Sequence, residues 1–470
     1  MPDILFEPGS FRDRTSRIFY SCGSVYRALT QQALQEWETF STTQFYRRLS
    51  AEGKIIRGER KDDALSLDLA REWAAVLKHP TLPFISYPYE WPFSMLRDAA
   101  LLQLELLLAA LDEGLTMKDA TPFNFQWLGT QPLFIDLPSF ERFTPGEPWV
   151  GYRQFCQLFL YPLLLQAYKD IPFQPWLRGS LDGIEPEQCQ RLMSLRDFLR
   201  PGVLSHVYLQ AKAQSQYAAT ARNVKAELRE AGFDAALIQA NVKRLQKLVR
   251  KLSWRRATST WSDYTEQTSY NTEDEQRKKA FVRQVAQAES RELVWDLGCN
   301  TGVFSRIAAE NARTVVAMDA DHLVVERLYH SLKAEEQTTI LPLVSNLADP
   351  SPNLGWRGCE RKTLPERGKP DLTLCLALIH HIVITANVPL KEFVDWLANL
   401  TQELVIEFVT RNDPMVRTLL RNKRDIYADY HQEYFERCLK EAFTVIRQES
   451  LASGARLLYY GRTKRTSAAS

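Results

Sequence analysis

The stretch VWDLGCNTGVFS, residues 294–305, sets a short apolar run that ends in an acid against a turn with two glycines four residues apart. This pattern is typical of a buried strand, a tight turn and the start of a helix. Asp296 then lies at the carboxyl end of the strand, and Gly298 and Gly302 let the backbone turn without a Cβ in the way. The stretch therefore predicts a pocket in which a compact polar molecule lies across the backbone.

Strand-like and helix-like segments alternate from about residue 258 to the C-terminus. Helical patterns at 304–312 and 388–400 separate continuous apolar runs, which indicate strands covered on both faces. The pattern predicts an α/β fold, a Rossmann-like domain of seven strands that binds its ligand at the carboxyl ends of parallel strands. The expected strands are LVW (293–295), TVVAM (314–318), TILPLV (339–344), LTLCL (372–376), LVIEFV (404–409), FTVI (443–446) and RLLYY (456–460).

The spacing of the turn argues against a dinucleotide. A dinucleotide-binding turn needs G-x-G-x-x-G, whereas here the spacing is G-x-x-x-G and Asn300 stands where the second glycine would be. An acid at position 296 is also poorly suited to a place beside phosphates, so a ligand with a positive charge and no phosphate fits better. Two further polar residues follow the next two strands: Asp319 could accept hydrogen bonds from ribose hydroxyls, and Asn346 could meet an adenine edge.

With these residues, segment 260–470 resembles the class I S-adenosylmethionine-dependent methyltransferases. The block WDLGCNTG followed by VVAMDAD carries the resemblance, although Cys299 and Asn300 stand where many members have glycine or alanine. The resemblance implies S-adenosylmethionine as the cofactor, with Asp319 on the ribose and Asn346 beside the adenine. The alternative is an α/β domain that has lost its cofactor. The residues implied to line the methionine part are Asp296, Gly298, Cys299, Asn300, Thr301 and Gly302.

The segment CLALIHHIVITANVPL (375–390) follows the fourth expected strand. The resemblance puts the end of this strand at the reacting methyl group, so Leu376, Ala377, His380 and His381 are candidates for the reaction centre. A histidine suits the role of general base if the acceptor arrives protonated. Alternatively, one histidine caps a strand and the other packs inside the domain.

Two other segments are candidates for binding the acceptor or covering the site. Tyr427, Tyr430 and Tyr434 could contact a ring-bearing acceptor, or lie on the exposed side of ordinary helices. The segment 259–274, with Tyr264 and Tyr270, precedes the first strand, where a lid over the cofactor is expected.

Residues 1–204 carry a second pattern. Asp119 and Asn124 form D-x-x-x-x-N, and Asp136 follows in an apolar run. Kinases use this spacing for a catalytic base and magnesium ligands, and CGSVYRAL (22–29) is similar to a glycine-rich hairpin. The usual His-Arg pair is replaced by Met117 and Lys118. The resemblance implies an α-rich α+β domain with a degenerate kinase-like fold that transfers no phosphate; a coincidental spacing in a helical domain is the alternative.

Residues 205–257 are expected to be a helical linker between this domain and residues 258–470. An apolar stripe runs from Ile238 to Leu252, and the other faces hold cations without an acid among them. The helix could lie on a phosphate-rich partner or a membrane surface, or could be a connecting helix with a solvated basic face. The cations are Lys243, Arg244, Lys247, Arg250, Lys251, Arg255 and Arg256.

Composition narrows the class of protein. The net charge of +2 gives no general attraction to nucleic acid, and there is no Asn/Asp-Pro-Pro-aromatic motif after the fourth strand. Seven scattered cysteines without a CxxC pair indicate reduced thiols and no metal site. The N-terminus lacks the pattern of a signal peptide, and the apolar run 99–111 is too short for a membrane span. We therefore expect a cytoplasmic methyltransferase with a small-molecule acceptor; a phosphotransferase and a non-catalytic S-adenosylmethionine-binding protein are the alternatives.

Overall fold

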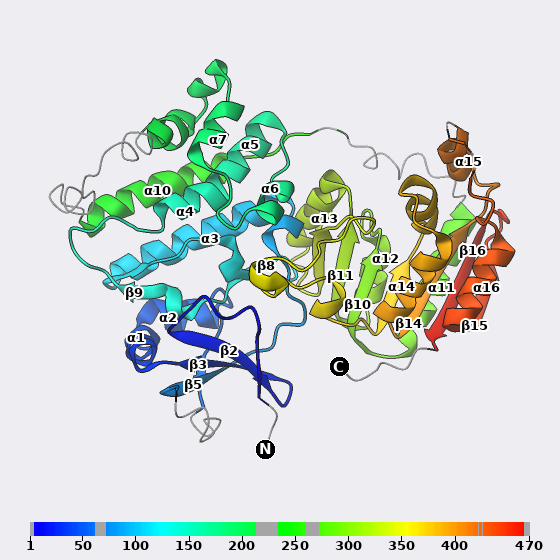
Figure 1. The fold of residues 1–470 in the computed structure, drawn as a ribbon, viewed down its shortest axis with the longest axis horizontal. Coiled ribbons are helices and arrows are strands. Elements are labelled where there is room, and N and C mark those ends of the chain that lie inside the picture. Colours follow the sequence, from blue (N-terminus) through cyan, green and yellow to red (C-terminus); the bar gives the residue numbers. More distant parts are fainter. Residues whose placement is uncertain are drawn as a thin grey trace. The chain divides into compact units, whose positions relative to one another are not determined.

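All seven segments expected as strands lie in one sheet (Figure 1). The structure is a computed structural model that describes residues 4–61, 72–212, 234–256, 258, 272–421, 423–424 and 426–464. The sheet order is β12-β11-β10-β13-β14-β16-β15; β16 runs antiparallel to β14 and β15, and the other pairs are parallel. The mixed α/β class is confirmed. The strands are β10 (Arg291–Leu297), β11 (Ala312–Asp319), β12 (Ile340–Val344), β13 (Leu372–Cys375), β14 (Glu403–Val409), β15 (Phe443–Ser450) and β16 (Arg456–Thr463).

Helices cover this sheet on both faces. One apolar cluster joins the sheet to α11 (Thr272–Ala288), α12 (Val303–Ala309) and α13 (His322–Ala334). The opposite face carries α16 (Gln432–Ala442), whose Phe435 stacks on Phe408 of β14 with ring centroids 4.6 Å apart. Two further helices are α14 (Leu390–Leu400), which packs against α16, and α15 (Pro414–Arg421). Because side chains alternate along a strand, Val405 and Glu407 of β14 face α11, whereas Phe408 faces α16.

A chain of four buried charges crosses the α11 face. Lys278 Nζ lies 2.6 Å from Glu407, Arg456 lies 3.2 Å from the same carboxylate, and Arg456 also lies 2.9 Å from Asp413. All four side chains are at most 5 % exposed. Buried charges are tolerated when each has an opposite partner, and these two cations and two carboxylates meet that condition.

The N-terminal part contains a second, smaller sheet. Its five strands are antiparallel in the order β1-β2-β3-β5-β4, and β2 and β3 form the expected hairpin, with positive φ at both turn residues, Cys22 and Gly23. The strands are β1 (Leu5–Phe6), β2 (Ser16–Ser21), β3 (Ser24–Leu29), β4 (Glu59–Arg60) and β5 (Ala75–His79), with the separate pairs β6 (Leu115–Met117) and β9 (Phe140–Arg142), and β7 (Phe125–Leu128) and β8 (Gln131–Phe134).

The apolar run 99–111 lies in α3 (Phe93–Asp112), a helix whose residues are largely buried. The basic segment forms α10 (Ala235–Lys251), which packs its apolar stripe against α3 and leaves Lys243, Lys247 and Arg250 exposed. Among the described residues, the remaining α-helices are α1 (Gln31–Ser41), α2 (Gln44–Ala51), α4 (Tyr152–Phe155), α5 (Tyr161–Lys169), α6 (Gln174–Gly179) and α7 (Pro186–Leu192).

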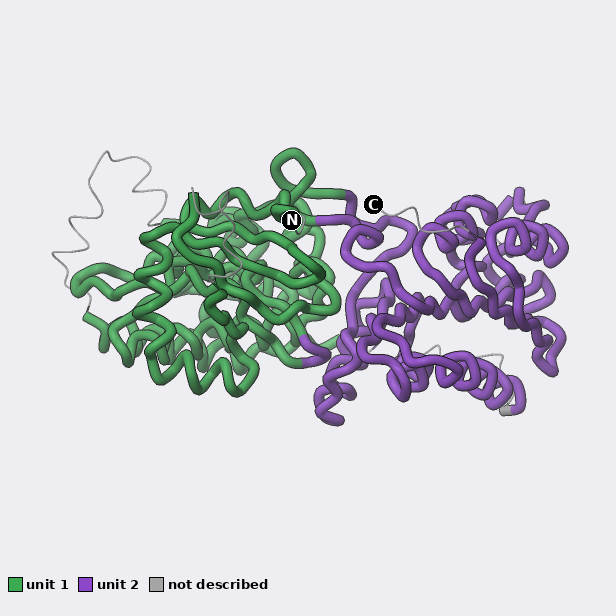
Figure 2. Tube along the Cα trace, turned by 90° about the horizontal axis from the view of Figure 1, so that it is seen from below, with its two compact units in different colours: residues 1–127, 131–256, 353–361 green, residues 128–130, 257–352, 362–470 purple. Residues whose placement is uncertain are grey.

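The chain divides into two compact units (Figure 2). Unit 1 comprises residues 1–127, 131–256 and 353–361, and unit 2 comprises residues 128–130, 257–352 and 362–470. Within the segment expected to be a linker, α10 belongs to unit 1, while 213–233 and 257 lie outside the described residues, as do Tyr264 and Tyr270. Among the helices that the structure describes, none combines the length and apolar character needed to cross a bilayer.

Removing the central cation of the buried chain should destabilise unit 2. Arg456→Met leaves Glu407 and Asp413 without it, which we expect to lower the free energy of unfolding by about 3–5 kcal/mol. Urea unfolding followed by circular dichroism measures this change. Arg313→Met is the matched control, because Arg313 forms an exposed pair with Glu292 and its loss should leave stability near the wild-type value. Equal stability of the two variants would contradict the prediction.

Candidate cofactor site

A cavity of about 450 Å³ opens at the carboxyl edge of the parallel strands. This volume lies within the range of small-molecule sites, roughly 300–1,000 Å³. The wall is formed by the segments that follow β10, β11, β12 and β13, together with α11 and α12. The lining residues are Glu275, Lys278, Gly298, Cys299, Asn300, Thr301, Val303, Phe304, Asp319, Ala320, Ser345, Asn346, Leu347, Ala348, Leu376, Ala377, Leu378, His381, Ile382, Thr385 and Ala386.

The turn after β10 is held in left-handed backbone conformations. Gly298 and Gly302 both have φ of 76°, and Asn300 between them has φ of 46°. A Cβ on Gly302 would lie 2.6 Å from Leu328 Cδ1 of α13, so this glycine also permits close packing of the turn on a helix. Gly302 does not line the cavity; its role is in the backbone.

Asp319 joins two of the loops at this edge. Its carboxylate accepts the backbone N–H of Asn300 at 3.0 Å and of Asp321 at 2.9 Å. Burial raises the pKa of Asp319, while these two hydrogen bonds oppose the shift. Asp319 therefore lies in the cavity wall in a fixed orientation, which suits a residue that accepts hydrogen bonds from a ligand.

Asp296 lies behind the wall rather than in it. Its side chain is 1 % exposed, it does not line the cavity, and its carboxylate accepts a hydrogen bond of 2.6 Å from Ser305 Oγ of α12. Burial raises its pKa to about 6, against the opposing effects of Ser305 and Lys278. Because Asp296 shares the strand face of Val294, it points toward α12, so it fixes the start of that helix.

The end of β13 brings one of the two candidate histidines to the cavity. Ala377 has φ of 53°, and a π-helical turn, His381–Thr385, begins soon after it. His381 lines the cavity, and burial lowers its pKa to about 4, so its ring is neutral at neutral pH. His380 is fully buried and does not line the cavity; its ring lies 4.0 Å from that of His381.

Eight of the ten residues expected to bind the cofactor line this one cavity, the exceptions being Asp296 and Gly302. The structure thus brings together Gly298, Cys299, Asn300, Thr301, Asp319, Asn346, Leu376 and Ala377. Their individual roles remain predictions.

Sequence reasoning missed two charged residues in the wall, Glu275 and Lys278 of α11. A signal was present, because Lys278 falls on the apolar stripe of α11, with Phe281, Val282 and Val285 at positions three, four and seven residues later. A lysine on the buried stripe of a helix indicates a specific partner for its charge.

The three tyrosines proposed for the acceptor do not line the cavity. The hydroxyl of Tyr427 lies 3.1 Å from the carbonyl oxygen of Ile384, and that of Tyr430 donates to the carbonyl oxygen of Val409 at 2.7 Å. Tyr434 lies beside Arg437 on α16. The first two are buried and support the backbone around the site, so they do not lie on the exposed side of helices; a contact of these tyrosines with an acceptor stays a prediction.

Unit 1 also brings its three predicted polar residues toward one another. Asn124 Nδ2 lies 3.4 Å from Asp136 Oδ2, which also accepts a hydrogen bond of 2.7 Å from Ser139 Oγ. Burial, with Asp136 nearby, raises the pKa of Asp119. Arg27 of β3 lies 3.3 Å from Asp136 Oδ1, so both oxygens of Asp136 already have partners.

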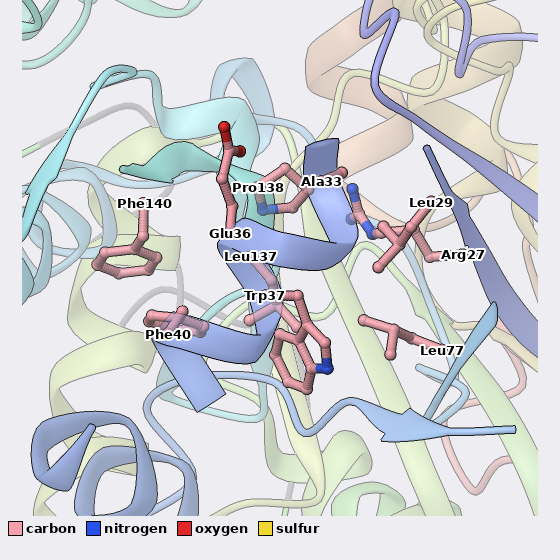
Figure 3. A pocket seen from close by; sticks show the side chains of 10 residues that line it. All are labelled: Arg27, Leu29, Ala33, Glu36, Trp37, Phe40, Leu77, Leu137, Pro138 and Phe140. Carbon is pink, nitrogen blue, oxygen red and sulfur yellow. The ribbon is translucent and has the colours of Figure 1, made fainter. Parts of the chain in front are cut away.

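This cluster does not fit the magnesium site that the spacing implies. Two carboxylates and an amide are suitable oxygen ligands, but a guanidinium stands at Asp136, where the metal would bind. Among the described residues, no group of three or more His, Cys, Asp or Glu side chains is arranged to hold a metal. The cavity beside Arg27 measures about 10 Å³, room for roughly one water molecule (Figure 3).

Similarity over the whole chain identifies the family. The chain is 33 % identical over 454 residues to the nodulation protein NoeA of Rhizobium meliloti (strain 1021), covering 96 % of this chain and 94 % of that protein. The chain belongs to the family of the protein NoeA. No protein-family model matches it.

Solved structures cover a smaller part of the chain. The N-methyltransferase NodS of Bradyrhizobium japonicum WM9 is 12 % identical and covers 42 % of this chain and 99 % of its own, with a TM-score of 0.31. A SAM-dependent methyltransferase of Aquifex aeolicus is 14 % identical and covers 43 % of this chain and 98 % of its own, with a TM-score of 0.30.

The raised pKa of Asp296 predicts a pH-dependent stability. Between pH 4 and 6 the unfolded carboxyl, with its ordinary pKa of 3.8, has lost its proton while the folded one keeps it. This group therefore reduces stability as the pH rises through that window, by about 3 kcal/mol in total. Urea unfolding at pH 4 and pH 7 measures it. Asp296→Asn should remove this contribution, so the stability of the variant relative to that of the wild type should increase from pH 4 to pH 7. A stability difference between the two proteins that stays constant over this range would contradict the raised pKa of Asp296.

Proposed function

We propose that the protein is an S-adenosylmethionine-dependent methyltransferase with a small-molecule acceptor. The observation that carries the proposal is the convergence of four strand ends on one cavity. In chain order the first five strands of the sheet are arranged 3-2-1-4-5, the order of dinucleotide-binding folds, and the cavity lies where that order reverses, between β10 and β13. The turn after β10 lacks the glycine spacing of those folds, which supports a cofactor without phosphates.

The roles follow the position of each segment along the cavity. In this proposal, Asp319 accepts hydrogen bonds from the ribose hydroxyls, and Asn346 borders the adenine. The turn Gly298–Thr301 holds the methionine part, and Leu376 and Ala377 lie beside the reacting group. When bound, the cofactor supplies an electrophilic methyl group on a sulfonium.

His381 is proposed to contact the acceptor. Its neutral ring can accept a hydrogen bond from a hydroxyl or an amine, which orients the acceptor atom in line with the methyl group. Positioning of this kind can contribute roughly 7–11 kcal/mol to the acceleration of a reaction between two bound molecules. His380, in contact with His381 but outside the cavity, is a positioning residue in this scheme.

We further propose a cytoplasmic location and the domain limits 1–204, 205–257 and 258–470. All seven cysteines are free, which is consistent with a reducing compartment. The net charge of +2 gives no general attraction to nucleic acid, which is consistent with a small-molecule acceptor.

Ligand binding and label transfer test the proposal together. S-adenosylhomocysteine should raise the melting temperature of the wild type, and Asp319→Ala should abolish the shift, since it removes hydrogen bonds to a charged group that contribute about 1.5–3 kcal/mol each. Methyl-labelled cofactor incubated with small-molecule extracts, followed by mass spectrometry, should give a labelled product with the wild type alone.

Two variants separate the possible outcomes. Asp395→Ala, at a half-buried position of α14 outside the cavity, should behave as the wild type. His381→Ala should keep the thermal shift and lose most of the label transfer, about 10²-fold or more if the ring acts in proton transfer. An equal thermal shift in wild type and Asp319→Ala would refute the site, and a shift without label transfer would favour a non-catalytic cofactor-binding protein.

The second candidate function, phosphotransfer by unit 1, is supported by the proximity of Asn124 and Asp136 but opposed by Arg27. We propose a kinase-like fold that transfers no phosphate, because the guanidinium neutralises the carboxylate on which a metal would depend. Unit 1 would then act in binding or in support of unit 2.

Calorimetry on the full chain checks this second proposal. Titration of the wild type with ATP and magnesium should produce no heat of binding, and Asp136→Asn should behave identically. Heat in the wild type that is lost in Asp136→Asn would contradict the proposal and restore the phosphotransferase alternative.

A further inference from the structure

Helix α11 contributes two opposite charges to the wall of the cavity. Glu275 and Lys278 both line it, and they lie three residues apart, so their side chains are neighbours on one face of the helix. Glu275 is exposed at the rim, where it pairs with Lys279 at 2.5 Å, whereas Lys278 is 4 % exposed. The wall thus offers a carboxylate near solvent and an ammonium group deeper in the protein.

Lys278 is held in place by its surroundings. Its Nζ lies 2.6 Å from Glu407 Oε2 and 4.8 Å from the centre of the Phe304 ring, and Phe304 also lines the cavity. Glu407 has no exposed surface and also pairs with Arg456. A cation fixed in this way keeps one position relative to the cavity, which favours recognition of a specific anion over general attraction.

The position of Lys278 along the sheet edge suggests which part of a ligand it meets. Asp319 ends β11, whereas the partner of Lys278, Glu407, lies on β14, three strands away in the order β11-β10-β13-β14. Adjacent strands are about 4.8 Å apart, so the two carboxylates are separated by about 14 Å across the edge. A ligand with its ribose at Asp319 and extended along the cavity therefore places its other end near Lys278.

We propose that Lys278 binds the carboxylate of the amino-acid end of the cofactor, with Glu275 facing the ammonium group of the same end. This inference rests on the proposed function and adds the part of the site that the strand-end loops do not provide. The amino-acid end is a zwitterion, and the two charges of α11 match its two charges. Lys278 contacts the ligand in this assignment, but at a distance from the reacting methyl group.

Ligands that differ only at the amino-acid end give the direct test. Calorimetry compares S-adenosylhomocysteine, which has the zwitterion, with 5′-methylthioadenosine, which lacks it. Lys278→Met should weaken binding of S-adenosylhomocysteine by about tenfold to hundredfold, as expected for loss of a charge-assisted hydrogen bond, and change binding of 5′-methylthioadenosine by less than about twofold. Lys278→Arg should retain most of the affinity for S-adenosylhomocysteine.

A second variant guards against loss of folding. Lys278→Met alone leaves Glu407 without that cation, so Lys278→Met/Glu407→Gln also neutralises the carboxylate and should restore stability without restoring affinity for S-adenosylhomocysteine. Lys391→Met, on the exposed surface of α14, is the matched control. The wild type gives a measurement that needs no variant: decarboxylated S-adenosylmethionine should bind at least tenfold more weakly than S-adenosylmethionine.

The outcomes distinguish this inference from the proposed function. If the wild type binds neither S-adenosylhomocysteine nor 5′-methylthioadenosine, the proposed function fails. If it binds both and Lys278→Met/Glu407→Gln weakens both equally, or neither, Lys278 is a structural residue and the inference is overturned. Equal affinity of the wild type for the two S-adenosyl donors, with and without the carboxylate, would overturn it as well.

Discussion

The carboxylate of Asp319 is the constraint on which the geometry of the cavity depends. It accepts backbone N–H groups from the turn after β10 and from the loop after β11, so one side chain fixes two neighbouring strand ends. Asn300, which donates one of these bonds, has a positive φ, a conformation that costs free energy and persists only where the surrounding structure offsets that cost. The hydrogen bond from Asn300 to Asp319 contributes to that offset. The same carboxylate is thus part of the structure of the turn and part of the wall that a ligand would meet.

A second constraint acts beneath the cavity, where the buried chain of Lys278, Glu407, Arg456 and Asp413 links α11, β14 and β16. Each of these charges is expensive to bury alone, and the arrangement is acceptable because every cation meets a carboxylate. These four charged side chains also occupy buried positions that apolar side chains could have filled. Of these four residues, Lys278 alone lines the cavity. A bound ligand could therefore contact Lys278 but not Arg456.

Much of this architecture could be predicted from sequence, for identifiable reasons. Most of the seven strands are continuous apolar runs, and the acid, glycines and polar residues mark where the strands end, so many residues at the cavity edge were predictable from their place in the chain together with the family resemblance. A position at a strand end does not by itself show which face Asp296 occupies; the alternation of side chains along the strand sets it on the face of Val294, toward α12. Tyr427 and Tyr430 could not be assigned, because their hydroxyl partners, Ile384 and Val409, are distant in sequence. Lys278 was missed because α11 reaches the cavity only through tertiary packing.

The hydrogen bonds of the turn after β10 give a physical reason why this cavity suits a ligand without phosphates. A phosphate-binding turn directs free backbone N–H groups at the ligand. Here the N–H groups of Gly298 and Cys299 both donate to the carbonyl oxygen of Met318, that of Gly302 donates to Cys299, and that of Asn300 donates to Asp319. These four amides are engaged within the protein, and the charged side chain that lines the cavity beside them is the carboxylate of Asp319. A pyrophosphate would meet a carboxylate and no free amide among these four positions, whereas a ribose would meet an acceptor for its hydroxyls. The hydrogen-bond acceptors of the turn's amides, together with the spacing of its glycines, therefore favour a ligand without phosphates.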